Sequence, residues 1–253
     1  MQQAIQQRLF DRLRAAPSKA TVAGSLPVLF FGDLFTARVV TVGLNPSRQE
    51  YLDTRGSELT GTARRFETVG SLGVRDRAAL APDHAGKAIE TMRDYFGIDK
   101  PVYSWFAGLA RVVEGLGASF QEGTAAHLDL VQEATDPVWS GLSKIDRAEA
   151  TRLLKSDLPF LKWQIEAFPI RVIVCTSRRV LDETSALIGA TFVDEGDFAR
   201  LRWRIGSASV GDRTVGVVGW NLPLVRPTGL TRETQRELGG LLAARLDTAG
   251  IAV

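Results

Sequence analysis

Residues 38–47 read Arg-Val-Val-Thr-Val-Gly-Leu-Asn-Pro-Ser, and this stretch decides the fold. The β-branched run at 39–42 is too short for a helix and favours a buried strand. Gly43 then allows a tight turn or a close approach of a ligand to the backbone. Asn45 places an amide directly after the strand, and Pro46 prevents further strand pairing. Ligands of open α/β sheets bind at this end of the strands, so Asn45 either faces a ligand or caps a following helix.

Short apolar runs alternate with segments of helical periodicity along the rest of the chain. The expected strands are 28–31, which we place beside 38–42 in the sheet, then 126–131 and 171–176. The last two, 201–205 and 215–218, are expected to form a hairpin across 211–212. The expected helices are 2–15, 85–96, 104–116, 146–168 with a break or kink at Pro159, 178–188 capped by Ser177, and a closing helix from about 231. This alternation predicts an α/β fold, a three-layer α/β/α sandwich with a mainly parallel central sheet. We expect one domain over 1–253, with 1–27 as an N-terminal helical extension.

The composition argues against several classes of protein. No run of eighteen apolar residues occurs, and the first residues are polar, so we expect a cytoplasmic protein without a membrane partner. One cysteine, Cys175, and two histidines, His84 and His127, argue against zinc, iron–sulfur and histidine-built metal sites. We therefore expect no metal and no cofactor. The net charge of +2 favours a nucleic-acid partner only weakly, although arginines cluster at 64–65, 178–179 and 200–204.

A long segment of weak periodicity, 47–80, follows the first key strand. Long irregular connections inside compact domains are usually functional or disordered. Because Tyr51, Phe66 and the arginine pair at 64–65 lie within it, we expect a functional loop.

Two stretches near opposite ends of the chain resemble motifs of one family, the uracil-DNA glycosylases. Residues 39–47 are similar to the first motif of the mismatch-specific branch, a hydrophobic strand followed by Gly, an apolar residue, Asn, Pro and a small residue. Residues 226–231, Arg-Pro-Thr-Gly-Leu-Thr, resemble its second motif, Asn-Pro-Ser-Gly-Leu-Ser. Residues 63–66, Ala-Arg-Arg-Phe, resemble its Ala-Asn-Arg-Phe segment, and 128–131 falls where the base-reading strand of the family lies.

The resemblance implies a monofunctional DNA N-glycosylase that flips a base from double- or single-stranded DNA and hydrolyses its glycosidic bond. We expect the protein to be a monomer. Asn45 is the expected catalytic residue, because its amide cannot act as a base but can aim a water at the sugar C1′. The expected base-binding residues are Gly43, Leu44, Tyr51, Phe66, Asp129 and Arg226. The expected DNA-binding residues are Ser47, Arg178, Thr228, Gly229, Leu230 and Arg232.

Several of these residues have two interpretations. Tyr51 is favoured over Phe66 for stacking on the flipped base, since the counterpart of Phe66 in relatives packs in the core. Arg226 either stabilises the departing base as an anion or contacts a phosphate. Leu230 either fills the gap left by the flipped base or anchors the closing helix.

Two departures from the family pattern concern the substrate. Arg226 stands where relatives carry Asn or His, and Asp129 where uracil readers carry Asn. A carboxylate only accepts hydrogen bonds, so it repels uracil O4 and welcomes the amino group of cytosine. If Asp129 faces the pocket, we expect a cytosine-like base, including modified cytosines such as those of phages. A register shift of one residue would instead turn Asp129 to the other face of the sheet.

Two other functions compete with a glycosylase. The chain could be a nucleic-acid-binding protein of the same fold without turnover, or a nucleoside or nucleotide hydrolase that uses the same strand-end cleft. Cleavage assays on oligonucleotides and on free nucleosides separate the three hypotheses.

Overall fold

The β-branched run at 39–42 forms β1 (Val39–Gly43), a strand that is buried along its whole length. In this computed structural model, which describes residues 2–222, 224 and 230–251, β1 lies between β2 (Ala125–Asp129) and β3 (Val172–Cys175). Both neighbours run parallel to β1. A strand covered on both faces needs apolar residues at every position, which explains the absence of alternation in this run.

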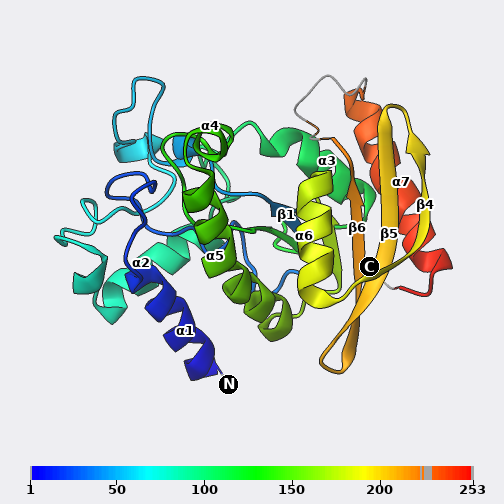
Figure 1. Cartoon of the computed structure of the whole chain (residues 1–253), viewed down its shortest axis with the longest axis horizontal. Coiled ribbons are helices and arrows are strands. Elements are labelled where there is room, and N and C mark those ends of the chain that lie inside the picture. Colours follow the sequence, from blue (N-terminus) through cyan, green and yellow to red (C-terminus); the bar gives the residue numbers. More distant parts are fainter. Residues whose placement is uncertain (1, 223, 225–229, 252–253) are drawn as a thin grey trace.

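The described part of the sheet has six strands in the order β2-β1-β3-β6-β5-β4 (Figure 1). β6 (Arg213–Trp220) continues the parallel part beside β3, and β5 (Leu201–Val210) and β4 (Thr191–Phe198) are added antiparallel. The expected hairpin between β5 and β6 and the mainly parallel sheet are both confirmed.

Seven helices in the described residues accompany the sheet. They are α1 (Gln2–Arg14), α2 (Pro82–Arg93), α3 (Phe106–Gly115), α4 (Trp139–Ile145), α5 (Arg147–Ala167), α6 (Arg178–Ile188) and α7 (Arg232–Thr248). Ser177 caps α6 as expected, since its side chain accepts a hydrogen bond from the backbone N–H of Val180.

The neighbours of two glycines in β6 show that helices lie on both faces of the sheet. A Cβ atom at Gly219 would lie 2.9 Å from Leu181 of α6, and one at Gly216 would lie 3.1 Å from Leu246 of α7. Residues 216 and 219 point to opposite faces of the strand, so α6 and α7 cover different faces. The α/β/α layering is therefore confirmed.

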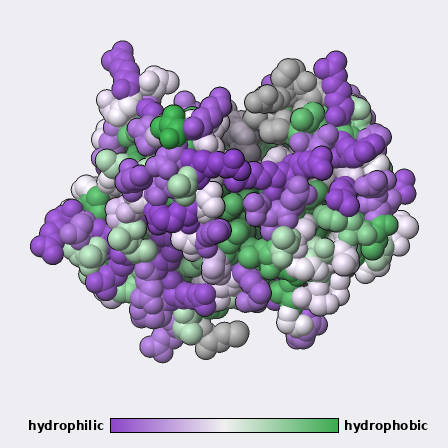
Figure 2. All heavy atoms as spheres, viewed as in Figure 1, coloured by the Kyte–Doolittle hydropathy of each residue, from purple (hydrophilic) through white to green (hydrophobic). Residues whose placement is uncertain are grey.

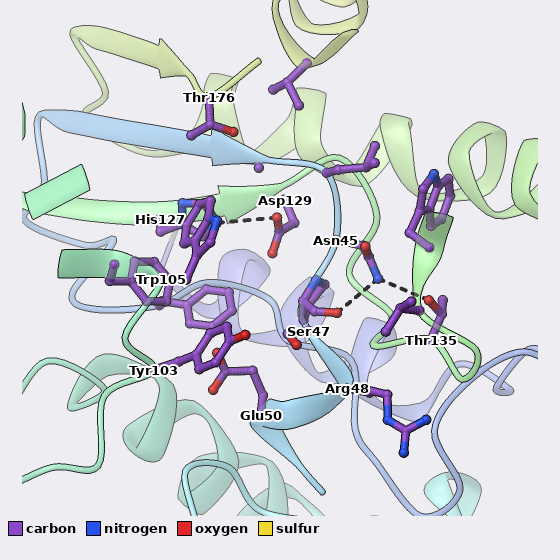
Figure 3. Close-up of a pocket in the computed structure, with 18 of the residues that line it drawn as sticks. Asn45, Ser47, Arg48, Glu50, Tyr103, Trp105, His127, Asp129, Thr135 and Thr176 are labelled. Carbon is purple, nitrogen blue, oxygen red and sulfur yellow. Dashed lines mark hydrogen bonds and ion pairs between the residues drawn. The ribbon is translucent and has the colours of Figure 1, made fainter. Parts of the chain in front are cut away.

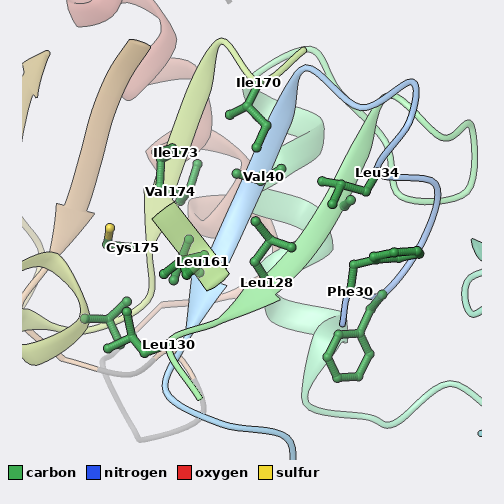
Figure 4. Close-up of a cluster of buried hydrophobic side chains, with 14 of the residues drawn as sticks. Phe30, Leu34, Val40, Leu128, Leu130, Leu161, Ile170, Ile173, Val174 and Cys175 are labelled. Atoms are coloured by element: carbon green, nitrogen blue, oxygen red, sulfur yellow. The ribbon is translucent and has the colours of Figure 1, made fainter. Parts of the chain in front are cut away.

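The core on the α5 side is built from neighbouring parallel strands. Val40, Leu128 and Ile173 come from β1, β2 and β3 and lie beside Leu161 of α5 (Figure 4). All four side chains are fully buried. Burial of this size supplies the main favourable free energy of folding, at roughly 1.5–3 kcal/mol for each large apolar side chain.

Four parts of the fold differ from the sequence-based expectation. Residues 28–31 do not form a strand beside β1, because Phe31 makes only an isolated antiparallel bridge with His127 of β2. The strand β4 was not expected, since it is an edge strand rich in charged residues. The short α4 was not expected either, and α5 continues through Pro159 without a break.

The segment 47–80 contains only short 3-10 helices, η1 (Arg48–Glu50), η2 (Gly61–Ala63) and η3 (Arg77–Ala79), as its weak periodicity indicates. On the face seen in Figure 2, polar side chains predominate, and apolar ones occur between them. Among the described helices, none combines the length and the apolar character needed to cross a membrane.

Candidate functional site

A cavity of about 540 Å³ lies at the carboxyl ends of the parallel strands. The segment after β1 contributes one wall, and the end of β2 and the start of α6 contribute others (Figure 3). Pockets of this size hold small organic ligands, and a nucleobase is well within the range. The polar residues that matter most for its chemistry are Asn45, Glu50, His127 and Asp129.

Asn45 is held in one orientation at the cavity wall. Its Nδ2 donates hydrogen bonds to the carbonyl oxygens of Pro46 at 3.0 Å and Glu133 at 3.2 Å, and to Thr135 Oγ1 at 3.3 Å. Its Oδ1 is turned away from these acceptors, toward the cavity (Figure 3). An amide oxygen in this position can accept a hydrogen bond from a water but cannot take up its proton.

Buried ion pairs anchor the segment that holds Asn45. Arg77 donates to both carboxylate oxygens of Glu133, at 2.9 and 2.8 Å, and Arg12 adds a contact at 3.2 Å. Burial by itself raises the pKa of Glu133, but the hydrogen bonds and charges of Arg77 and Arg12 outweigh it and hold that pKa below its ordinary value. Arg12 also pairs with Asp157 of α5 at 3.0 Å. The backbone carbonyl that orients Asn45 thus belongs to a firmly held residue.

The strand register places Asp129 in the cavity. Gly43 and Asp129 are aligned across β1 and β2, and His127 lies two residues earlier on the same face. His127 Nε2 is 3.3 Å from Asp129 Oδ1, and its Nδ1 is 2.7 Å from Thr41 Oγ1. Within the described residues, the buried Asp129 Oδ2 has no hydrogen-bond partner.

Residue 43 has to be a glycine because the side chains of Asp129 and His127 lie close to its backbone. A Cβ atom at residue 43 would collide with Asp129 Oδ1 and would lie 2.9 Å from His127 Nε2. The glycine therefore leaves room for the Asp129 carboxylate, as well as lining the cavity itself. Its neighbour Leu44 also lines the cavity.

Glu50 is a cavity residue that was not expected. It ends η1 and is only 2% exposed, and burial raises its pKa to about 8. The Tyr95 hydroxyl donates to its Oε1 at 3.0 Å and its Oε2 at 2.9 Å. The hydrogen bond from Tyr95 and the charge of Arg65 oppose the effect of burial, whereas the charge of Asp129 adds to it. In the sequence, the only feature that could have indicated Glu50 as a cavity residue is its position, five residues after Asn45.

The aromatic residues at the cavity are not the expected ones. Tyr103 and Trp105 line it. Tyr51 lies in the core instead, 2% exposed, and its hydroxyl donates to the Leu26 carbonyl at 2.6 Å. Phe66 is also a core residue. The expectation that Tyr51 stacks on a base is therefore wrong, because a side chain tied into the core does not reach a ligand.

The expected DNA-binding residues have different positions. Ser47 lines the cavity and accepts a hydrogen bond from the Gln49 N–H. Arg178 is exposed at the start of α6, directly after Ser177 of the cavity wall. Arg232 is exposed at the start of α7, and Leu230 is half-buried against the core. Three further expected residues, Arg226, Thr228 and Gly229, lie outside the described residues.

In the described part of the chain, no cluster of three or more His, Cys, Asp or Glu side chains is arranged to hold a metal ion. No protein-family model and no curated protein matches this sequence.

Proposed function

We propose that this protein is a DNA N-glycosylase that flips a nucleotide into the cavity and hydrolyses the bond between base and sugar. The observation that carries the proposal is the fixed amide of Asn45, whose oxygen faces a cavity of nucleobase size beside the buried Asp129. The resemblance of residues 39–47 and 226–231 to glycosylase motifs supports the same conclusion.

In this mechanism, Asn45 acts by positioning. A base inside a duplex cannot be reached, so the nucleotide is extruded and its base enters the cavity beside Tyr103 and Trp105. Breaking the glycosidic bond develops positive charge at C1′. The Asn45 oxygen holds a water against C1′, and the hydrogen bonds to Nδ2 keep that oxygen in place.

Asp129 favours a base with an amino group. A buried acceptor without a partner costs roughly 1–3 kcal/mol, and a donor on the ligand removes that cost. The exocyclic amine of cytosine supplies such a donor, whereas O4 of uracil would face the carboxylate. The proposed substrate is therefore a cytosine-like base, modified or plain, rather than uracil.

An oligonucleotide panel tests the proposal. Single- and double-stranded DNA carrying uracil, cytosine or 5-substituted cytosines is incubated with the protein, and abasic sites are then cleaved with alkali. Strand breaks at one class of base support a glycosylase. Binding without strand breaks for every base would indicate a nucleic-acid-binding protein, and cleavage of free nucleosides alone would indicate a nucleoside hydrolase.

Asn45→Ala then tests the catalytic assignment on whichever base is excised. We expect the single-turnover rate to fall about a hundredfold or more, with DNA affinity nearly unchanged, because a positioning residue is lost. Gln121→Ala is the matched control, since it removes an exposed amide just before β2, at the opposite end of the sheet. An unchanged rate for Asn45→Ala would contradict the assignment.

A further inference from the structure

Glu50 has no role in the mechanism above, although it is a buried carboxyl group in the wall of the same cavity. We infer that Glu50 donates its proton to a ring nitrogen of the bound base while Asp129 accepts from the neighbouring amino group, so that the pair selects and activates cytosine-type bases. This inference rests on the proposed glycosylase function and deepens it.

The hydrogen bonds around Glu50 leave its own proton available to a ligand. The backbone N–H of Tyr103 donates to the Tyr95 hydroxyl oxygen at 3.1 Å, and that hydroxyl in turn donates to Glu50. A neutral carboxyl group accepts this bond and still has one O–H to donate. Since Glu50 lines the cavity, a ligand there is the natural acceptor.

The surroundings of Glu50 keep it neutral near pH 7. Burial is the largest effect and raises its pKa to about 8, and the Asp129 charge at the end of β2 acts in the same direction. Tyr95 and Arg65 oppose the shift, with Arg65 Nε 3.9 Å from Glu50 Oε2. At pH 7 the neutral form then outnumbers the ionised form by roughly ten to one.

Glu50 and Asp129 together match one edge of cytosine. Both residues line the same cavity (Figure 3), the charge of Asp129 acts on Glu50, and Asp129 Oδ2 is buried without a partner among the described residues. Cytosine presents an amino donor beside the acceptor N3, which complements an Asp129 acceptor and a Glu50 donor. Uracil presents the reverse pattern, with the acceptor O4 opposite the Asp129 acceptor and the donor N3–H opposite the Glu50 donor. Both contacts are unfavourable.

The same proton assists bond cleavage. Cytosine is a poor leaving group as an anion. As the C1′–N1 bond breaks and its electron pair moves to the base, the Glu50 proton is transferred to N3, and the base leaves neutral. The oxygen of the water held by Asn45 bonds to C1′, the water loses a proton to solvent, and another proton from solvent restores Glu50. General acid catalysis of this kind contributes about 10²–10⁴-fold.

Glu50→Gln tests the proton transfer, because the amide retains a donor and the bond from Tyr95 but cannot release a proton. We expect excision of a cytosine-type base to fall about a hundredfold or more. The loss should be smaller for a 5-fluorocytosine substrate, whose ring leaves more readily. Glu122→Gln, on the exposed loop before β2, is the control and should have wild-type activity. Equal losses on both bases, or no loss, would overturn the inference.

The pH profile gives a second test. Because the protonated form is the active one, wild-type excision should be constant below pH 7 and should decline above about pH 8. Tyr95→Phe removes a hydrogen bond that lowers the pKa of Glu50, so this decline should move to higher pH. This variant also serves if Glu50→Gln does not fold. A decline that stays in place in Tyr95→Phe would contradict the inference.

Binding of free bases separates this inference from the proposed function. By calorimetry, wild type should bind cytosine more tightly than uracil, and its cytosine affinity should fall about tenfold between pH 7 and pH 9 as Glu50 ionises. Glu50→Gln should show no such fall. This binding pattern without excision of any base would support the donor–acceptor pair and refute the glycosylase. Excision with pH-independent binding would support the glycosylase and refute the role of Glu50.

Discussion

In the proposed function, a single atom, Asp129 Oδ2, restricts which ligands the cavity accepts. The other carboxylate oxygen is 3.3 Å from His127 Nε2, and Gly43 allows the backbone of β1 to pass close to it. An acceptor held this way cannot turn to solvent, so a ligand must bring the donor. Selectivity at this position therefore depends on one hydrogen-bonding group.

Asp129→Asn should shift the preference from cytosine-type bases toward uracil. An asparagine amide can donate to O4, so we expect the uracil-to-cytosine ratio of kcat/KM to rise about tenfold or more, corresponding to at least 1.4 kcal/mol. The ratio is measured on matched oligonucleotides. Asp212→Asn, on the exposed turn between β5 and β6, is the control. An unchanged ratio would show that Asp129 does not read the base.

At the scale of elements, buried charges connect parts of the chain that are distant in sequence. Arg12 of α1 and Arg77 of η3 meet Glu133 in the segment after β2, and Asp157 of α5 completes the group. The Glu133 carbonyl accepts a hydrogen bond from Asn45. These four charged residues therefore hold in place the segment that orients the Asn45 amide. A buried pair contributes little net stability, but removal of one partner is costly.

Arg77→Met should lower the free energy of unfolding by about 3–5 kcal/mol, because it leaves a buried carboxylate short of its main partner. Urea denaturation at pH 7 measures the loss. The loss should become smaller below about pH 4.5. The lowered pKa of Glu133 means that its ionised form stabilises the fold at higher pH, and this stabilisation disappears as Glu133 is protonated. Arg75→Met is the control, because Arg75 is 84% exposed and pairs with the exposed Asp76. Similar losses for both variants would contradict the buried role of Arg77.

At the scale of the whole molecule, an exposed arginine at the start of α6 follows directly after a residue of the cavity wall. Ser177 lines the cavity, and the next residue, Arg178, has a side chain that is 80% exposed. The first residue of α7, Arg232, is exposed as well. An exposed arginine that directly follows a residue of the cavity wall, as Arg178 does, is suited to a phosphate that flanks a flipped nucleotide.

Arg178→Ala should weaken binding to DNA of any sequence. Loss of one phosphate contact reduces the slope of log K against log salt by about 1. Fluorescence anisotropy at several salt concentrations measures both effects. Lys162→Ala, near the end of α5 that leads into β3, removes an exposed charge at the opposite end of the sheet and should leave the slope unchanged. An unchanged slope for Arg178→Ala would exclude a phosphate contact.

The sequence by itself determined the elements whose signals are local. The β-branched run of β1 and the Ser177 cap of α6 are readable from neighbouring residues, because strand preference and capping act over a few positions. The place of Asn45 after a strand end follows from the same stretch. The periodic face of α7 is likewise readable, with Leu238, Leu242 and Leu246 fully buried.

Only the tertiary structure decided which side chains meet in the cavity. The pairing of Gly43 with Asp129 turns the carboxylate inward, and strand register depends on contacts between distant segments. Glu50 comes from the irregular segment 47–80, and Tyr95 lies just beyond the end of α2. No local pattern indicates that the two meet or that burial raises the pKa of Glu50. Tyr51 was misjudged for the same reason, since a local pattern does not reveal whether a side chain in a long loop faces a cavity or the core.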